Sequence, residues 1–125
     1  MAATSSAASV DITVSDNVTW RDAFQFGVLG DTSWSFTGQS FILEVKVSVD
    51  DAAALFTLST ALGSVVVDDH VARVLHLNVP ELTVRASLPV GVYVYDLVMF
   101  DGSAPPVRNL LMTGNVYVIR GVSES

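Results

Sequence analysis

The sequence contains no cysteine. This absence excludes structural disulfides, thiolate zinc sites, iron–sulfur clusters and cysteine nucleophiles. Nothing in the composition ties the protein to an oxidising compartment, so we expect it to fold in a reducing cytoplasm. Its length of 125 residues fits a single domain that buries a hydrophobic core without covalent staples.

Basic residues are scarce. Six Lys and Arg stand against thirteen Asp and Glu, which gives a formal net charge of −7. A surface this acidic repels nucleic-acid phosphates and has no attraction for anionic lipids. Neither a nucleic acid nor a membrane is therefore an expected partner. The negative charge is typical of a protein that stays soluble through self-repulsion.

Charged residues of both signs together make up only 15% of the chain, while hydrophobic residues make up 50%. Typical soluble domains carry about 25% charged residues. No apolar run approaches the ~18 residues of a membrane span. The apolar excess then either fills a core or covers a surface that is buried against partners, because the cores of interfaces are depleted in charge. We expect both.

The N-terminus lacks the basic start and the apolar stretch of a signal peptide. Residues 1–8 are mostly small, and such segments usually form a flexible arm. We therefore expect an arm over 1–8, a sandwich domain over 9–122, and a protein that is made in the cytoplasm and not secreted.

Alternation of apolar and polar side chains with a period of two dominates the sequence. Its clearest runs are 41–49, 75–79 and 92–100, which predict strands. Both faces of 92–100 are largely apolar, which is typical of a strand in the centre of a sheet. Dense turn formers follow at 101–106.

A further strand pattern runs from Val107 to Ile119 and is broken at Thr113-Gly114, where a bulge is expected. Together with the 92–100 strand, this pattern predicts a long hairpin over 92–119. Separately, the segment from Asp50 to Leu55 predicts one helical turn. Shorter predicted strands are 9–14, 23–27, 33–36, 55–60, 64–67 and 82–86. Many short strands punctuated by glycines favour an all-β antiparallel sandwich over βαβ units.

Catalytic and metal-binding patterns are weak. Asp68-Asp69-His70 contains an acid–base pair, but no Gly-x-Ser-x-Gly nucleophile elbow is present, and His76 lies on the polar face of its strand. Asp50-Asp51 and Asp68-Asp69 lack the ligand spacing of a calcium loop. We expect solvated turns at these positions, with no catalytic residue, no metal site and no cofactor.

Aromatic residues are concentrated in the N-terminal third of the chain. They are Trp20, Phe24, Phe26, Trp34 and Phe36. The first interpretation is that they close one end of the core. Aromatic side chains also anchor protein partners or stack on sugar rings, so an interface and a carbohydrate site remain as alternatives.

The segment from Leu88 to Leu97 reads Leu-Pro-Val-Gly-Val-Tyr-Val-Tyr-Asp-Leu. It resembles the entry into the penultimate strand of fibronectin-III and immunoglobulin-like sandwiches, where a tyrosine bonds to the backbone a few residues upstream. The resemblance implies an immunoglobulin-like fold with Tyr93 as this corner tyrosine. Since no cysteine follows Tyr93, the disulfide-bonded antibody type is excluded.

The order of segments over residues 16 to 122 is similar to that of small β-sandwich proteins of tailed bacteriophages. It comprises Trp20 and Phe24, the Thr37-Gly38 step, the 41–49 strand, the 91–97 segment and the closing 110–118 strand. The nearest example is the N-terminal domain of baseplate upper proteins. That family implies a structural adaptor without catalytic or cofactor residues. The chain lacks the helical and receptor-adaptor segments that normally follow this domain.

These observations lead to one functional hypothesis: a non-enzymatic component of a phage or phage-like virion, in its tail, baseplate, neck or capsid decoration. Its expected partners are other virion proteins and further copies of itself. The N-terminal arm and the 101–106 turn are the predicted contacts, with Trp20, Trp34, Asp101, Pro105 and Pro106 as candidate interaction residues. The alternatives are a carbohydrate-binding module, with a glycan as ligand, and a hydrolase, which needs His70 beside a serine and a carboxylate.

Overall fold

The computed structural model describes residues 8–26, 34–48, 50 and 53–121 of the protein. Strands dominate, as the period-two pattern predicts. In chain order the elements are β1 (Ala8–Ser9), β2 (Ile12–Ser15), β3 (Trp20–Gln25), β4 (Ser40–Lys46), β5 (Phe56–Ser59), β6 (Val65–Asp69), β7 (Val74–Val79), α1 (Glu81–Ser87), β8 (Gly91–Phe100) and β9 (Arg108–Ile119).

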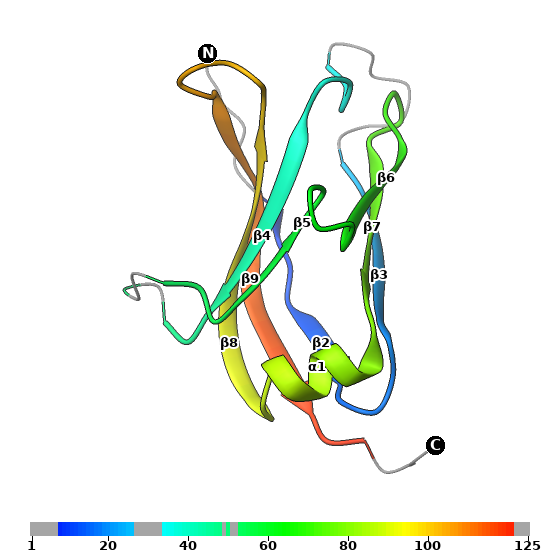
Figure 1. The fold of residues 1–125 in the computed structure, drawn as a ribbon, viewed down its shortest axis with the longest axis vertical. Coiled ribbons are helices and arrows are strands. Elements are labelled where there is room, and N and C mark those ends of the chain that lie inside the picture. The colour runs from blue at the N-terminus through cyan, green and yellow to red at the C-terminus, as the bar shows by residue number, and fades with distance from the viewer. Residues whose placement is uncertain (1–7, 27–33, 49, 51–52, 122–125) are drawn as a thin grey trace.

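The strands form two sheets packed face to face, as Figure 1 shows. The larger sheet has the order β1-β9-β8-β4-β5, with β2 also paired to β9, and the smaller sheet has the order β3-β7-β6. Neighbouring strands are antiparallel except for β1 and β2, which run parallel to β9. The predicted all-β sandwich is therefore confirmed, with a parallel N-terminal edge that the sequence did not predict.

Alternation along the strands builds the core. On β8 the side chains of Tyr93, Tyr95, Leu97 and Met99 point inward and are buried. Their counterparts on β4 and β7 follow the same period: Phe41, Leu43 and Val45, and Leu75, Leu77 and Val79. Each large apolar side chain removed from water contributes about 1.5–3 kcal/mol before the entropic cost of ordering it.

The N-terminal aromatic residues pack mainly into the core. Trp20 is 2% exposed, Phe26 and Phe36 are buried, and Phe24 is half-buried. The ring of Phe36 meets that of Phe41 edge to face, with centroids 4.6 Å apart. The first interpretation of this cluster, closure of the core, is confirmed.

One predicted strand is wrong. Residues 82–86 belong to the helix α1, which lies at one end of the sandwich between β7 and β8 (Figure 1). The apolar residues at 82, 84 and 86 suggested alternation, but only Val84 in this helix is buried. Pro80 precedes the first turn with its fixed φ, and Glu81 pairs with Arg85 one turn later at 3.2 Å.

Three smaller differences concern the other predicted elements. Trp34 to Phe36 form no strand, and residue 33 lies outside the described residues. The described part of 50–55 consists of turns and bends, not a helical turn, with residues 51 and 52 outside the description. The bulge in β9 falls at Leu111, since Leu97 pairs with Met112 and the next residue with Leu110, and not at Thr113-Gly114. The predicted arm over 1–8 lies outside the description, except for Ala8 in β1.

Gly114 marks a different feature, the point where the N-terminal segment crosses β9. A Cβ at this position would lie 2.1 Å from the carbonyl oxygen of Val10, so only glycine fits. Val10 donates its amide to the Thr113 carbonyl, and the Asp11 carboxylate accepts the Asn115 amide, at 2.9 and 3.0 Å. The side chains of Ile12 and Val14 then enter the core beside β9.

Candidate docking face

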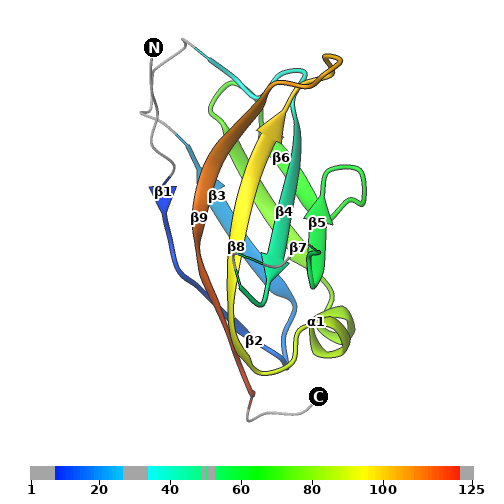
Figure 2. The same cartoon turned by 90° about the vertical axis from the view of Figure 1, so that its left-hand side faces the viewer.

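The outer face of the larger sheet is the surface that turns away from β3, β6 and β7, and Figure 2 looks onto it. No helix or strand of the described chain covers it, but the described ends of the β4–β5 connection project from it and pass in front of β8 (Figures 1 and 2). It carries two apolar rows that run across the strands. Residues paired across neighbouring strands define the Val98 row (Leu110, Val98 and Ile42) and the Val92 row (Tyr117 and Val92).

Two side chains of these rows are exposed, Leu110 at 44% and Val92 at 59%, while Ile42, Val98 and Tyr117 are half-buried. Ile119, at the end of β9 and outside the rows, is 49% exposed. The sequence analysis predicted β8 as a central strand because both of its faces are apolar. Its position inside the sheet is confirmed, but its second apolar face lies on the surface and not in a core.

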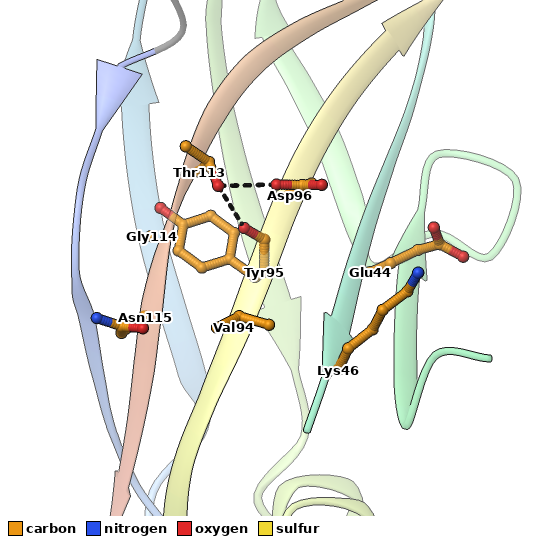
Figure 3. A pocket seen from close by; sticks show the side chains of 8 residues that line it. All are labelled: Glu44, Lys46, Val94, Tyr95, Asp96, Thr113, Gly114 and Asn115. Carbon is orange, nitrogen blue, oxygen red and sulfur yellow. Dashed lines mark hydrogen bonds between the residues drawn. The ribbon is translucent and has the colours of Figure 1, made fainter. Parts of the chain in front are cut away.

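Between the two rows lies a polar band. One cross-strand line places Glu44 opposite Asp96, which in turn lies opposite Thr113, and the next line places Lys46 opposite Val94. Figure 3 shows these side chains pointing outward from β4, β8 and β9. The Thr113 hydroxyl donates to the Asp96 carboxylate at 2.8 Å. Two carboxylates directly opposite each other across strands are destabilising.

The band contains a shallow depression of about 200 Å³. Its lining is Glu44, Lys46, Val94, Tyr95, Asp96, Thr113, Gly114 and Asn115 (Figure 3). Pockets that hold small-molecule ligands usually measure about 300–1,000 Å³ and bury most of the ligand. The depression is therefore suited to one side chain of a partner protein better than to a complete substrate.

The face is electrically balanced although the protein is acidic. Glu44 and Asp96 carry negative charges, and Lys46 and Arg108 carry positive ones, while the whole chain has a net charge of −7. The Arg108 guanidinium lies 5.4 Å from the centroid of the Phe100 ring. The acidic surplus consequently lies elsewhere, and this face does not repel another acidic protein through a net negative charge of its own.

Tyr95 is among the lining residues, but its side chain is only 2% exposed and points into the sandwich. Burial, reinforced by the negative charges of Asp11, Asp22 and Asp96, raises the pKa of the Tyr95 phenol far above its usual range. The hydroxyl therefore stays protonated and donates a hydrogen bond to the Val10 carbonyl. A phenol held neutral in this way is a structural donor and not a base or a nucleophile.

The structure separates the acid–base group suggested by Asp68-Asp69-His70. Asp68 pairs with His76 across the strands at 2.8 Å, on the outer face of the smaller sheet. Asp69 instead accepts the amides of Val71 and Ala72 and shapes the β6–β7 turn. His70 is exposed in that turn, where its backbone carbonyl accepts the Phe36 amide.

The two aspartate pairs are Asp50-Asp51 and Asp68-Asp69. Asp51 lies outside the description, and Asp68 and Asp69 are engaged as above. Among the residues that the structure describes, no group of three or more His, Asp or Glu side chains is placed to hold a metal ion.

The candidate interaction residues from the sequence do not come together. Trp20 is buried and donates its indole N–H to Asp22 at 2.8 Å, which removes it from the surface contacts. Trp34 is half-buried with its ring against Phe36. Asp101, Pro105 and Pro106 lie at the tip of the β8–β9 hairpin, where both prolines are exposed.

Sequence reasoning missed the buried Arg73. Its Nε donates to the Phe26 carbonyl at 2.8 Å, one terminal nitrogen donates to the Trp34 carbonyl at 2.9 Å, and its guanidinium lies 4.9 Å from the Trp34 ring centroid. Arg73 thus joins the end of β3 to the segment that leads into β4. A lone arginine in a turn gave no signal of this.

Comparison with known proteins adds no identity: no family model and no curated protein matches the chain. Across the described residues, no helix has the length and apolar character needed to cross a bilayer.

Proposed function

We propose that the protein is a non-enzymatic docking module, a structural component of a phage or phage-like virion, and that the outer face of the larger sheet is its binding surface. The observation that carries this proposal is the pair of apolar rows on β4, β8 and β9, in which Leu110 and Val92 are exposed. A sheet that only served its own core would present polar side chains at these positions.

The character of the face supports a protein partner. It combines aliphatic side chains with Tyr117, Phe100 and Arg108, and tyrosine, phenylalanine and arginine are enriched at protein interfaces. Its polar residues form one band between the two apolar rows. Contiguous apolar surface of this kind usually marks an interaction site.

The family assignment within this proposal is immunoglobulin-like. Its support is the strand order, with β3, β7 and β6 in one sheet and β4, β8 and β9 in the other, and the short helix before β8. Tyr93 also donates its hydroxyl to the Pro89 carbonyl, four residues upstream. The phage assignment rests on the resemblance in the order of sequence segments.

The carbohydrate-binding alternative requires an exposed tryptophan on which a sugar ring can stack. Trp20 is 2% exposed. One edge contact and one cation–π contact already engage the ring of Trp34, with Phe36 and Arg73 respectively. The arrangement therefore favours the protein-docking function over the sugar-binding one.

The experiment that tests the virion role uses particles produced from the genome that encodes the chain. Mass spectrometry of gradient-purified particles is expected to find the protein in a fixed ratio to the major structural proteins. A Leu110→Asp variant, which places a charge in the Val98 row, is expected to be depleted from particles. The matched control is Val66→Asp, which places the same charge on the outer face of the smaller sheet. Particles without the wild-type protein would contradict the proposal.

A further inference from the structure

The strand β3 ends the smaller sheet, because it pairs with β7 on one side and with no strand of the described chain on the other. The Phe26 amide donates to the Arg73 carbonyl, just before β7, at 3.0 Å, so β3 residues in phase with Phe26 direct their backbone groups toward β7. The alternate residues Arg21, Ala23 and Gln25 therefore direct their amides and carbonyls away from the sheet. None of these backbone groups has a hydrogen-bond partner within the described chain.

The other edges of the two sheets are shorter or better protected. β6 has an irregular register between Val67 and Asp69 and ends in two consecutive aspartates, and both features discourage pairing with another chain. β2 and β5 are only four residues long, and on β5 the backbone amide and carbonyl of Ser59 are already bonded to Ser64. β3 is six residues long and contains neither a proline nor a bulge. It therefore offers the longest regular edge among them.

The larger sheet extends beyond β3 on this side of the sandwich. Figure 2 shows the smaller sheet behind the larger one, with β6 toward the β5 side and β3 toward the β9 side, while β1 and β2 lie beyond β9. A strand added to β3 would therefore continue the smaller sheet opposite β1 and β2. It would extend the face-to-face packing that the other strands already show.

Asp22 gives this edge a chemical preference. On β3 its side chain shares the inward face with Trp20 and Phe24, and its carboxylate accepts the Trp20 indole N–H at 2.8 Å. Within the described chain, neither Asp22 nor Asp11 forms an ion pair. Both carboxylates contribute to the raised pKa of the Tyr95 phenol, so they lie near the same point between the sheets. An inward carboxylate at a free edge opposes an apolar strand and therefore selects for a basic one.

We propose that β3 is a second docking site, which pairs with an extended segment of another protein that carries a lysine or arginine opposite Asp22. The segment adds to the smaller sheet as an antiparallel strand, in the arrangement that β3, β7 and β6 already have. Its backbone satisfies the amides and carbonyls of Arg21, Ala23 and Gln25. The site is separate from the docking face on the larger sheet and goes beyond the proposed function.

The register fixes the side-chain pattern of the partner segment. Positions opposite Arg21, Ala23 and Gln25 form hydrogen-bonded pairs and point outward. Positions opposite Asp22 and Phe24 form non-hydrogen-bonded pairs and point inward, and such side chains approach each other more closely. A basic residue opposite Asp22 consequently lies against its carboxylate, and an aliphatic residue opposite the half-buried Phe24 extends the core. The net charge of −7 also attracts a basic segment to the chain.

The probe is the peptide acetyl-Thr-Val-Thr-Lys-Thr-Val-Thr-amide, in which the lysine lies opposite Asp22 and the valines lie opposite its inward neighbours on β3. Hydrogen exchange followed by NMR in the full chain measures the pairing at single amides. Without peptide, the amides of Arg21, Ala23 and Gln25 are expected to exchange as fast as unpaired amides. At about 1 mM peptide and a dissociation constant of about 100 µM, exchange at all three is expected to slow about tenfold.

Two N-methylated peptides provide matched controls. Methyl groups on the third and fifth residues, both threonines, replace N–H groups that face β3, so binding is expected to be lost. Methyl groups on the two valines replace N–H groups that point away from β3, so the affinity is expected to stay within about threefold. A peptide with glutamate in place of lysine is expected to bind at least about tenfold more weakly, because it sets a carboxylate against Asp22.

Ala23→Pro tests the same edge on the protein. The proline removes an amide that has no partner in the described chain, so the fold is expected to persist, as it does with prolines at other sheet edges. Protection of Arg21 and Gln25 by the peptide is expected to be lost. Ala23→Val keeps the amide and is expected to bind as wild type. Asp22→Asn keeps an acceptor for the Trp20 indole and is expected to reduce the preference for the lysine peptide at least about threefold.

Four results would overturn the inference. They are no protection at about 1 mM peptide, equal binding of the two methylated peptides, equal binding of the lysine and glutamate peptides, and unchanged protection in Ala23→Pro. Protection of the three amides without peptide would also overturn it, since the chain itself or a second copy then covers the edge. None of these results bears on the docking face, which the particle experiment with Leu110→Asp tests separately.

Discussion

The hydroxyl of Tyr95 in β8 donates a hydrogen bond to the backbone carbonyl of Val10, 85 residues earlier in the chain. The bond crosses β9 at Gly114, where the absence of a side chain lets the Val10 carbonyl of the N-terminal segment approach closely. A tyrosine, a glycine and a carbonyl from three segments therefore act together to fix the edge of the larger sheet.

Removal of this hydroxyl is expected to destabilise the fold. Tyr95→Phe keeps the buried ring but leaves the Val10 carbonyl without its donor, which costs about 1–2 kcal/mol. Urea unfolding followed by tryptophan fluorescence measures the change in the free energy of unfolding. Tyr117→Phe, on the outer face, is the control and is expected to alter stability by less than about 0.5 kcal/mol. Equal effects of the two substitutions would show that the bond to Val10 contributes nothing.

The raised pKa of Tyr95 predicts a loss of stability in alkali. Below about pH 10 the phenol is protonated in both the folded and the unfolded chain. Above it the unfolded chain releases this proton while the folded chain retains it, so the free energy of unfolding falls by up to about 1.4 kcal/mol per pH unit. The difference in this slope between wild type and Tyr95→Phe isolates the contribution of Tyr95 from those of other groups. Parallel slopes would count against a buried, neutral phenol.

A methyl group at Gly114 is expected to displace the N-terminal edge. In Gly114→Ala the added Cβ overlaps the Val10 carbonyl at 2.1 Å, so β1 and β2 must shift away from β9. We expect a loss of roughly 2 kcal/mol or more, as for other overpacked sites. Gly102→Ala is the matched control, because a Cβ there meets nothing within 4 Å. Thermal unfolding of both variants separates steric overlap from the general effect of replacing glycine.

Substitution of the buried Arg73 is expected to be among the most damaging single changes. Arg73→Met has a similar length but leaves the Phe26 and Trp34 carbonyls without their charged donor. At about 1.5–3 kcal/mol for each lost bond, the free energy of unfolding should fall by roughly 3 kcal/mol or more. Arg21→Met, at an exposed position of β3, controls for the loss of a positive charge. A similar small effect of both variants would contradict the bridging function of Arg73.

Asp101 is expected to hold the tip of the β8–β9 hairpin. Its carboxylate accepts the amides of Val107 and Ser103, and these bonds, led by that of Val107, lower the pKa of Asp101. The bonds are therefore present at neutral pH and are lost as the pH falls below the usual carboxyl range. Hydrogen exchange at both amides should accelerate in Asp101→Ala at neutral pH.

The conservative variant Asp101→Asn provides the control for this turn. Its side-chain oxygen still accepts the two amides, but it does not titrate. Protection of Val107 and Ser103 should therefore persist in Asp101→Asn and lose its dependence on acid. Unchanged protection in Asp101→Ala would show that the turn holds without this side chain.

The sequence predicted most of the strands because their burial follows a local rule. Alternation along 41–49 and 92–100 identifies β4 and β8 within a few residues, and the turn formers at 101–106 identify the hairpin. The helix α1 was missed because its apolar residues also fit a period of two. Val84 and Leu88 are both buried and lie four residues apart, which is about one turn of a helix. This spacing was the signal for a helix in the sequence.

The docking face and the N-terminal edge could not be predicted in the same way. The two apolar faces of β8 are visible in the sequence, but which of them meets the core depends on the other sheet. Pairing of β1 and β2 with β9 depends on contacts between the two ends of the chain, which no local pattern encodes. For the same reason Arg73 is only recognised once Phe26 and Trp34 lie beside it.

The parallel attachment of β1 and β2 to β9 also fixes the order in which the molecule can be completed during its synthesis. Ile12 pairs with Val116 and Ser15 with Ile119, so β2 leaves the ribosome long before its partner β9 and has no partner until β9 has followed. Pairings of such long sequence separation are closed late and slowly. Every newly made chain therefore passes through a stage in which Ile12 and Val14 are exposed to the cell.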